Sequence, residues 1–162
     1  MESGIYGCPR AWADWLPPGA RRVRTRAGVR RRSWGVLALT PDGCRKLRRA
    51  EIECGLLLIP GNCAAEALPL VRAGRAASYG LSPRDSLTFS SLEEPVLCVQ
   101  RALPAPGGGV IEPQEIPLPG LPAPVEDFLP LLGLWLLRGP CVPQRGAAYF
   151  LRRWCQRFAG SG

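Results

Sequence analysis

The stretch from Glu53 to Leu92 constrains the fold of this chain most, because apolar segments and turn residues follow each other there in a regular order. Its first segment, Leu56–Ile59, is a continuous apolar run closed by Pro60-Gly61. A short apolar run that ends in a turn is typical of a strand buried on both faces, as in a parallel sheet. The stretch is therefore predicted to supply a central strand.

A helix and two further strands are predicted to follow in the same stretch. Asn62 can accept hydrogen bonds from the first-turn amides of a helix, Pro69 predicts a kink, and Gly74 is predicted to end the helix. Residues 75–81 and 86–91 are predicted strands, because turn residues separate them and the second segment alternates apolar with hydroxyl side chains.

The residues before this stretch extend the pattern. Trp34–Leu39 is predicted to be a strand, with Thr40 as the cap of the next helix and Pro41 in its first turn. Strand, helix, strand, helix and strand between residues 34 and 81 form a βαβαβ unit with a parallel sheet. We therefore predict an α/β fold with a small Rossmann-like βαβαβ unit, followed by β-strands and two C-terminal helices.

The second half of the chain is predicted to be β-rich and then helical. Residues 95–103 favour β structure, and residues 110–118 are predicted to be an edge strand or an extended strap because their two prolines lack an amide donor. Helices are predicted over residues 125–137 and 146–159 from their apolar periodicity.

Basic residues concentrate at both ends of the chain. Residues 1–49 hold twelve basic and three acidic residues, residues 50–140 five and ten, and residues 141–162 four and none. Residues 1–33 are predicted to be a basic, flexible N-terminal arm, and residues 34–162 a single α/β domain.

The arginines at these ends are candidates for binding a polyanion. Arginine suits phosphate, and basic runs bind nucleic acid by releasing counterions. An arginine-rich composition explains the same runs without a ligand, since the chain has twenty arginines and one lysine. The candidate residues are Arg21, Arg22, Arg24, Arg30, Arg31, Arg32, Arg152 and Arg153.

Polar residues follow the predicted parallel strands. Ligands of parallel sheets bind beyond the carboxyl ends of the strands. The candidate ligand-binding residues at these ends are Thr40, Asp42, Asn62, Tyr79 and Ser82.

The two predicted C-terminal helices suggest association with a protein. Leucines occur on every face of residues 129–137, so this helix is either buried on most sides or paired with another chain. A protein partner or a second copy is predicted to contact Leu132, Trp135 and Leu136. The basic amphipathic helix of residues 146–159 is expected to dock on its own domain, although such helices also lie on anionic membranes.

The sequence carries no motif that fixes a catalytic chemistry. It has no histidine, no phosphate-binding loop and no CxxC pair among its seven cysteines. We therefore expect no cofactor, no metal site and no catalytic residue, and favour a binding protein over an enzyme. An odd number of scattered cysteines, no visible secretory signal and no membrane-spanning run predict a cytoplasmic protein.

Residues 75–92, RAASYGLSPRDSLTFSSL, resemble the segment that closes the nucleotide-binding domain of Mur ligases. In that family an apolar strand and a helix precede a strand containing Tyr-Gly, here Tyr79-Gly80, and then a further strand. The likeness covers about 40 residues from Glu53, while Ile59–Asn62 departs from the acidic turn of the family. The ATP-binding loop and the metal and carbamate ligands have no counterpart here. The resemblance thus implies a partial relative without ligase activity.

Three hypotheses of function follow from the sequence. The first is a non-catalytic binding or protein-interaction domain. The second is a basic protein associated with nucleic acid. The third is a divergent enzyme or a degenerate, Mur-ligase-like ligand-binding domain that uses the strand ends near Asn62 and Ser82.

Overall fold

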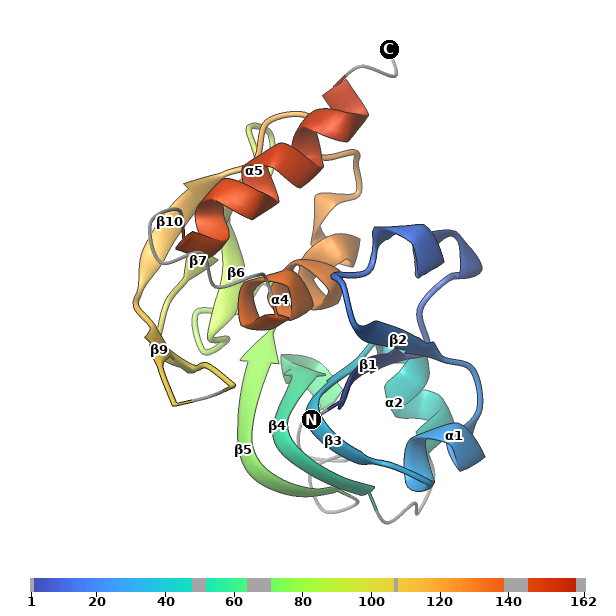
Figure 1. Ribbon diagram of the computed structural model, residues 1–162. Helices are drawn as coiled ribbons and strands as arrows, with labels where there is room; N and C mark the ends of the chain where they lie inside the picture. Colours follow the sequence, from blue (N-terminus) through green and yellow to red (C-terminus); the bar gives the residue numbers. More distant parts are fainter. Residues whose placement is uncertain (1, 48–51, 64–70, 107, 139–145, 160–162) are drawn as a thin grey trace.

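The computed structural model describes residues 2–47, 52–63, 71–106, 108–138 and 146–159 (Figure 1). Its strands and helices run in the order β1 (Glu2–Tyr6), η1 (Arg10–Trp15), β2 (Ala20–Val23), α1 (Arg26–Arg30), β3 (Ser33–Leu39), α2 (Pro41–Leu47), β4 (Ile52–Pro60), η2 (Gly61–Cys63), β5 (Val71–Tyr79), β6 (Leu87–Ser91), β7 (Val96–Val99), β8 (Leu103–Pro104), β9 (Val110–Ile111), β10 (Gln114–Pro117), η4 (Val125–Phe128), α4 (Leu129–Arg138) and α5 (Gly146–Ala159). The η elements are 3₁₀ helices.

The described strands form one large, mostly parallel sheet and a small hairpin. The eight-stranded sheet has the order β10-β7-β6-β5-β4-β3-β1-β2, and β8 pairs with β9. Strands β1 to β6 pair in parallel, whereas β7 is antiparallel to both β6 and β10. The predicted α/β class with two C-terminal helices is confirmed. The edge strand predicted for residues 110–118 is confirmed for β10, which closes one side of the sheet, whereas β9 pairs with β8 in the hairpin instead.

The sequence predicts a basic, flexible N-terminal arm over residues 1–33, whereas the structure has β1, β2 and α1 in this range. β1 lies inside the sheet between β2 and β3, and its partners run from Glu2 opposite Trp34 to Tyr6 opposite Leu39. A side chain at Gly4 would overlap the ring of Trp34, whose Cζ3 lies 2.5 Å from an ideal Cβ position. The indole of Trp34 thus fills the space over Gly4. The pairing of β1 with β3 joins residues far apart in the chain, so the local periodicity of the sequence does not reveal it.

The predicted helix from Asn62 to Gly74 is wrong at its C-terminal end. β5 begins at Val71, and its residues 71–79 pair in parallel with β4. Gly74 therefore lies within a strand. The predicted kink at Pro69 falls outside the described residues.

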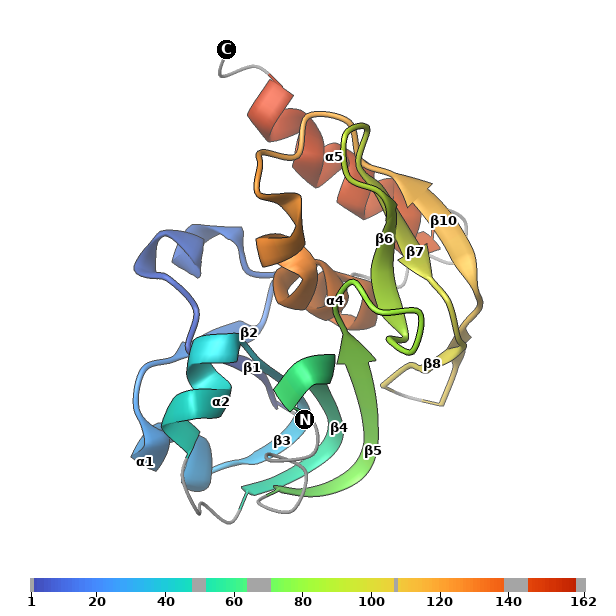
Figure 2. The ribbon, with the colours of Figure 1, turned by 180° about the vertical axis from the view of Figure 1, so that it is seen from behind.

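Side chains fill a core on each face of the sheet. One core packs against α4 and η1 and includes Ile5, Val36, Leu58 and Leu132. The other packs against α1 and α2 and includes Tyr6, Leu37, Leu57 and Leu47. Helix α4 crosses β1, β3 and β4, and α5 packs on α4. Figure 2 shows the sheet from behind, with α1 and α2 beside its lower half and α5 at the top.

The residues predicted to contact a protein partner are used within the chain. Leu132 and Leu136 are buried in the core. Trp135 is half-buried and donates a hydrogen bond from Nε1 to the Trp15 carbonyl oxygen at 2.8 Å. Trp15 also meets Trp154 of α5 edge-on, with ring centroids 6.4 Å apart. The apolar face of α4 is therefore covered by the N-terminal segment and by α5.

Candidate functional site

The strand order reverses between β1 and β3, and the chain leaves these two strands toward opposite faces of the sheet. After β1 it runs into η1, whose Trp12 belongs to the α4-side core. After β3 it enters α2, whose Leu47 belongs to the other core. Such a reversal leaves a crevice beyond the carboxyl ends of the two strands, where ligands of open α/β sheets bind.

Thr40 fixes the geometry at this crevice. Its amide and its hydroxyl both donate to the Tyr6 carbonyl oxygen, at 3.1 and 3.3 Å. The hydroxyl oxygen accepts from the Gly43 amide at 3.0 Å, which caps α2 as the sequence predicts. Gly7 has a φ of +89°, and an added Cβ there would overlap the Gly43 backbone. The ends of β1 and β3 are thus held in direct backbone contact with the first turn of α2.

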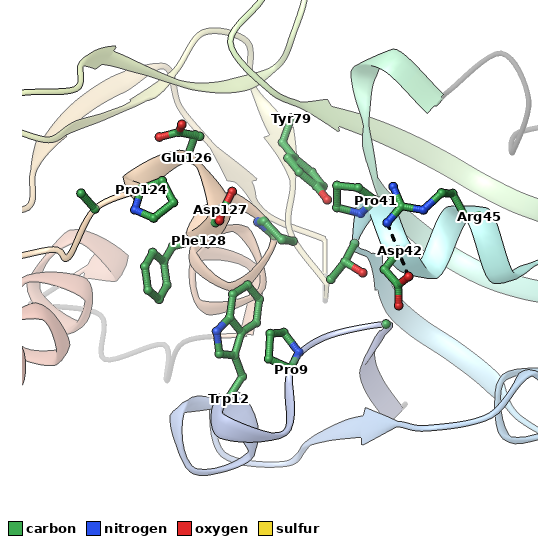
Figure 3. Close-up of a pocket in the computed structure, with 14 residues that line it drawn as sticks. Pro9, Trp12, Pro41, Asp42, Arg45, Tyr79, Pro124, Glu126, Asp127 and Phe128 are labelled. Carbon is green, nitrogen blue, oxygen red and sulfur yellow. Dashed lines mark hydrogen bonds and ion pairs between the residues drawn. The ribbon is translucent and has the colours of Figure 1, made fainter.

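A cavity of about 420 Å³ opens beyond these strand ends (Figure 3). One wall carries Pro41, Asp42, Arg45 and Tyr79, and the base is formed by Pro9 and Trp12. Thr40 also lines the cavity. The other wall is the segment that leads into α4, which contributes Pro124, Glu126, Asp127 and Phe128. Trp12 and Phe128 stack on each other with ring centroids 5.6 Å apart. We call this region the carboxyl-edge cleft.

The cleft continues along the sheet edge into a second cavity of about 560 Å³. The two cavities share Pro41, Tyr79, Glu126 and Asp127. The second adds Asn62, Ser82, Arg84 and Asp85. All five residues predicted from the strand ends therefore line one continuous cleft.

Asp85 stabilises the turn at the far end of the cleft. Its side chain is 3% exposed, and its Oδ2 accepts a hydrogen bond from the Ser82 amide at 3.0 Å. A Cβ at Gly61 or at Gly80 would overlap its carboxylate, so both glycines give it room. Gln100 donates from its side-chain amide to the Asp85 carbonyl oxygen at 2.7 Å. The turn of residues 82–85 is thus tied to Gln100, the residue that follows β7.

Tyr79 is a structural wall of the cleft. Its hydroxyl donates to the Leu39 carbonyl oxygen at 2.7 Å, which links the end of β5 to the end of β3. Burial raises the pKa of Tyr79 far above its usual value, with smaller contributions from Cys44 and Cys63. The hydroxyl therefore stays protonated, and its proton is already used inside the protein.

The charged groups of the cleft differ in how they are paired. Asp42 binds Lys46 at 2.8 Å and Arg45 at 3.5 Å. The hydrogen bond from Lys46, followed by the contact with Arg45, lowers the pKa of this carboxyl group. Among the described residues, Glu126 and Asp127 have no ion pair or side-chain hydrogen bond. Their carboxylates are therefore available to a ligand.

The candidate polyanion-binding arginines do not gather in one place. Arg32 donates to both carboxylate oxygens of Glu2, Arg21 lies 3.7 Å from the same carboxylate, and Arg22 donates to the Cys8 carbonyl oxygen. Arg24, Arg30 and Arg31 are exposed near α1, whereas Arg152 and Arg153 are exposed on α5. In both ribbon views α1 lies at the bottom and α5 at the top (Figures 1 and 2).

Sequence reasoning missed half of the cleft. Trp12, Glu126, Asp127 and Phe128 come from segments outside the predicted βαβαβ unit of residues 34–81. The one signal in the sequence is the acidic pair Glu126-Asp127 at the start of a predicted helix. Acidic residues are favoured at any helix N-terminus, so the pair does not by itself indicate a binding site.

No group of metal-ligating side chains occurs among the described residues, and no helix among them has the length and apolar character needed to cross a membrane. Comparison of the chain with protein-family models, with curated proteins and with solved structures gives no match.

Proposed function

We propose that this protein is a non-catalytic binding domain that holds a small molecule in the carboxyl-edge cleft. The observation that carries the proposal is the position of the cleft at the reversal of strand order between β1 and β3. Open α/β sheets bind their ligands at this place because the flanking loops diverge there. The apolar face of α4 gives no comparable support to a protein partner, since Leu132 and Leu136 are buried.

The lining of the cleft favours a planar ligand with nitrogen donors. Trp12, Phe128 and the prolines present apolar and aromatic surface. Glu126 and Asp127 supply carboxylate oxygens without partners among the described residues. Carboxylates accept hydrogen bonds from amino groups, and such charge-assisted bonds are stronger than neutral ones. A nucleobase or nucleoside with an exocyclic amino group has this chemistry.

Melting of the full chain with nucleosides tests the proposal. Adenosine and cytidine carry an exocyclic amino group, whereas uridine does not and is the control ligand. At a hundred times its Kd a ligand stabilises the folded state by about 2.7 kcal/mol. For a chain of this size that corresponds to a rise in Tm of roughly 5 to 10 °C. We expect this rise with adenosine or cytidine and a smaller one with uridine.

A pair of matched variants locates the binding. Glu126→Gln with Asp127→Asn removes the two cleft charges, and should abolish the preference for amino nucleosides. Glu93→Gln with Glu94→Gln removes an adjacent acidic pair outside the cleft lining and should preserve that preference. Unchanged melting with all three nucleosides, or equal effects of the two double variants, would contradict the proposal.

Nucleic-acid binding is a second candidate, favoured by the exposed Arg24, Arg30 and Arg31 near α1. Binding through these residues should weaken steeply between 50 and 200 mM salt, because each phosphate contact releases counterions. Association of an oligonucleotide that is insensitive to salt would rule it out.

Two further expectations belong to the same proposal. We propose a cytoplasmic location, supported by the six described cysteines, none of which forms a disulfide bond. Kinship with the closing segment of the Mur ligase nucleotide-binding domain stays a prediction, and nucleoside binding would support it.

A further inference from the structure

Three glycines form a row across neighbouring strands of the sheet. Trp34 pairs with Cys54 and Val36 with Leu56, so Gly35 lies opposite Gly55. Cys54 pairs with Ala73 and Leu56 with Arg75, so Gly55 lies opposite Gly74 in turn. A Cβ at Gly55 would lie 3.0 Å from the Gly35 carbonyl oxygen, and one at Gly74 would lie 3.1 Å from that of Gly55. The missing side chains thus leave the peptide backbone bare along this row.

The alternation of side chains changes at the glycine row. Trp34 belongs to the α2-side core, but Val36, two residues later, belongs to the α4-side core. Cys54 and Leu56 of β4 are divided between the two cores in the same way. The pairing of β1 with β3 also shifts here, between Glu2 and Ser3. Such irregularities bend strands, and β3, β4 and β5 curve strongly in Figure 1.

A cavity of about 580 Å³ lies over the bend and is separate from the carboxyl-edge cleft. Its floor includes Gly35 and Gly55, and one wall is the β8–β9 hairpin with Pro104, Ala105 and Pro106. Glycine within a strand often marks a place where a ligand approaches the backbone closely. We call this space the glycine-row cavity.

One polar group in this cavity is buried without a partner. Ser3 lines the cavity and is 0% exposed, and its Oγ has no hydrogen bond within the described part of the chain. A buried hydroxyl without a hydrogen-bond partner destabilises the folded state. A ligand that supplies a polar atom here would remove this destabilisation.

The pairing register of the strands places the cationic residue Arg75 at the end of the cavity opposite Ser3. Ser3 pairs with Val36, Val36 with Leu56, and Leu56 with Arg75. These four residues therefore form one line across β1, β3, β4 and β5, and all four line the cavity. Three strand spacings separate the backbones of its two ends, which is about 14 Å. Among the described lining residues Arg75 is the one with a charged side chain, and no ion pair holds it.

We propose that the glycine-row cavity binds a flat, elongated, mainly apolar molecule that carries a hydroxyl group at one end and a single anionic group at the other. Ser3 Oγ exchanges a hydrogen bond with the hydroxyl end, and the Arg75 guanidinium binds the anion. Val36, Leu56 and the proline-containing hairpin enclose the apolar body, which lies on the bare backbone of Gly35 and Gly55.

Titration of the ¹⁵N-labelled full chain with 6-hydroxy-2-naphthoate tests this proposal by amide chemical-shift changes. Saturable shifts are expected at the amides of Gly35, Gly55 and Ser3. 2-Naphthoate lacks the hydroxyl group, and 2-naphthol lacks the anionic group. An exposed ion pair contributes up to about 1 kcal/mol, so 2-naphthol should bind roughly fivefold more weakly. 2-Naphthoate should also bind more weakly, because it leaves Ser3 Oγ without its partner.

Two substitutions assign the ends of the ligand. Arg75→Gln should lower the affinity for 6-hydroxy-2-naphthoate to that for 2-naphthol, and Ser3→Ala should lower it to that for 2-naphthoate. Arg72→Gln is the matched control, because Arg72 is exposed on the same strand and does not line the cavity. Shifts confined to the carboxyl-edge cleft, no shifts at the glycine row, or equal affinities in Arg75→Gln and the parent protein would overturn the proposal.

Discussion

The carboxyl-edge cleft and the glycine-row cavity lie on the same parallel sheet and are built in opposite ways. The cleft is made by side chains and loops that gather beyond the strand ends, with Thr40, Tyr79 and Asp85 each held by hydrogen bonds to the backbone. The glycine-row cavity is made by missing side chains within the strands, where Gly35 and Gly55 leave the backbone bare. The position of a site built from loops follows from the strand order of the sheet, whereas the position of a site built within strands depends on the pairing register between neighbouring strands.

This difference affects how each region tolerates substitution. In the cleft, backbone meets backbone where Gly7 and Gly43 bring β1 against α2. At the bend, a Cβ at Gly55 or Gly74 would lie 3.0 or 3.1 Å from the carbonyl oxygen of the neighbouring strand, so that strand would have to move by a few tenths of an ångström. Substitutions at Gly7 and Gly43 should therefore be more damaging than substitutions in the glycine row.

Gly43→Ala should give the largest loss of stability. A Cβ at Gly43 would overlap the Tyr6 carbonyl oxygen, and that backbone atom is fixed by its hydrogen bonds from Thr40. Overpacking costs typically 1 to 3 kcal/mol, and we expect a loss of about 3 kcal/mol in the free energy of unfolding because backbone must move. Urea unfolding followed by circular dichroism measures it.

Gly28→Ala in α1 is the control for Gly43→Ala. The nearest atoms to a Cβ at Gly28 belong to the side chains of Val23 and Thr25, at 3.2 and 3.3 Å. Alanine is favoured over glycine in a helix by up to about 1 kcal/mol, so this variant should be unchanged or slightly more stable. Equal stability of the two variants would show that the ends of β1 and α2 are not in rigid contact.

Gly55→Val should give an intermediate loss, and it tests the bend. The added Cβ would lie 3.0 Å from the Gly35 carbonyl oxygen, and the two methyl groups would cover the cavity floor. We expect a loss of about 2 kcal/mol in the free energy of unfolding. Ala76→Val, at an exposed position of β5, should change it by less than about 0.5 kcal/mol. A Gly55→Val variant as stable as Ala76→Val would mean that the row does not need glycine.

The sequence predicted one side of the cleft because that side obeys a local rule. Thr40, Asp42, Asn62, Tyr79 and Ser82 each follow or end an apolar strand run, and parallel strands bring such ends together. Trp12 and Glu126 come from segments placed by packing over long sequence distances, which periodicity does not report. β1 is not predicted from the sequence for the same reason, because it is placed by its pairing with β2 and β3 and by the packing of Gly4 beneath the ring of Trp34.

The sequence predicts the wrong role for Gly74 because glycine occurs both at helix ends and within strands. Gly74 follows an apolar repeat at helical spacing, so it was predicted to end a helix. In the structure it aligns with Gly55 and Gly35, and this alignment becomes visible only when the register of β3, β4 and β5 is known. A single glycine within a strand lowers strand propensity, whereas three in one row mark a shared bend.

The smallest expected effect is a loss of unfolding free energy at alkaline pH, to which the two regions should contribute over different pH ranges. Burial raises the pKa of Cys54, beside the glycine row, from 9.0 to about 11, and it raises that of Tyr79 in the cleft from 10.0 to a still higher value. Above pH 9 the unfolded state loses the Cys54 proton while the folded state keeps it, so the contribution of Cys54 to stability is complete below pH 9 and declines as pH rises toward 11. The contribution of Tyr79 declines only above pH 10.

Cys54→Ala should therefore flatten the fall in unfolding free energy from pH 9, and Tyr79→Phe should flatten it only above pH 10. Urea unfolding at pH 7, 9, 10 and 10.5 under reducing conditions measures both slopes. Other buried thiols, such as Cys155 with a pKa raised to about 12, keep part of the decline in each variant. If Cys54→Ala loses stability as steeply as the parent protein between pH 9 and 10, then Cys54 is open to water at the bend. The strand-built cavity would then be the looser of the two regions.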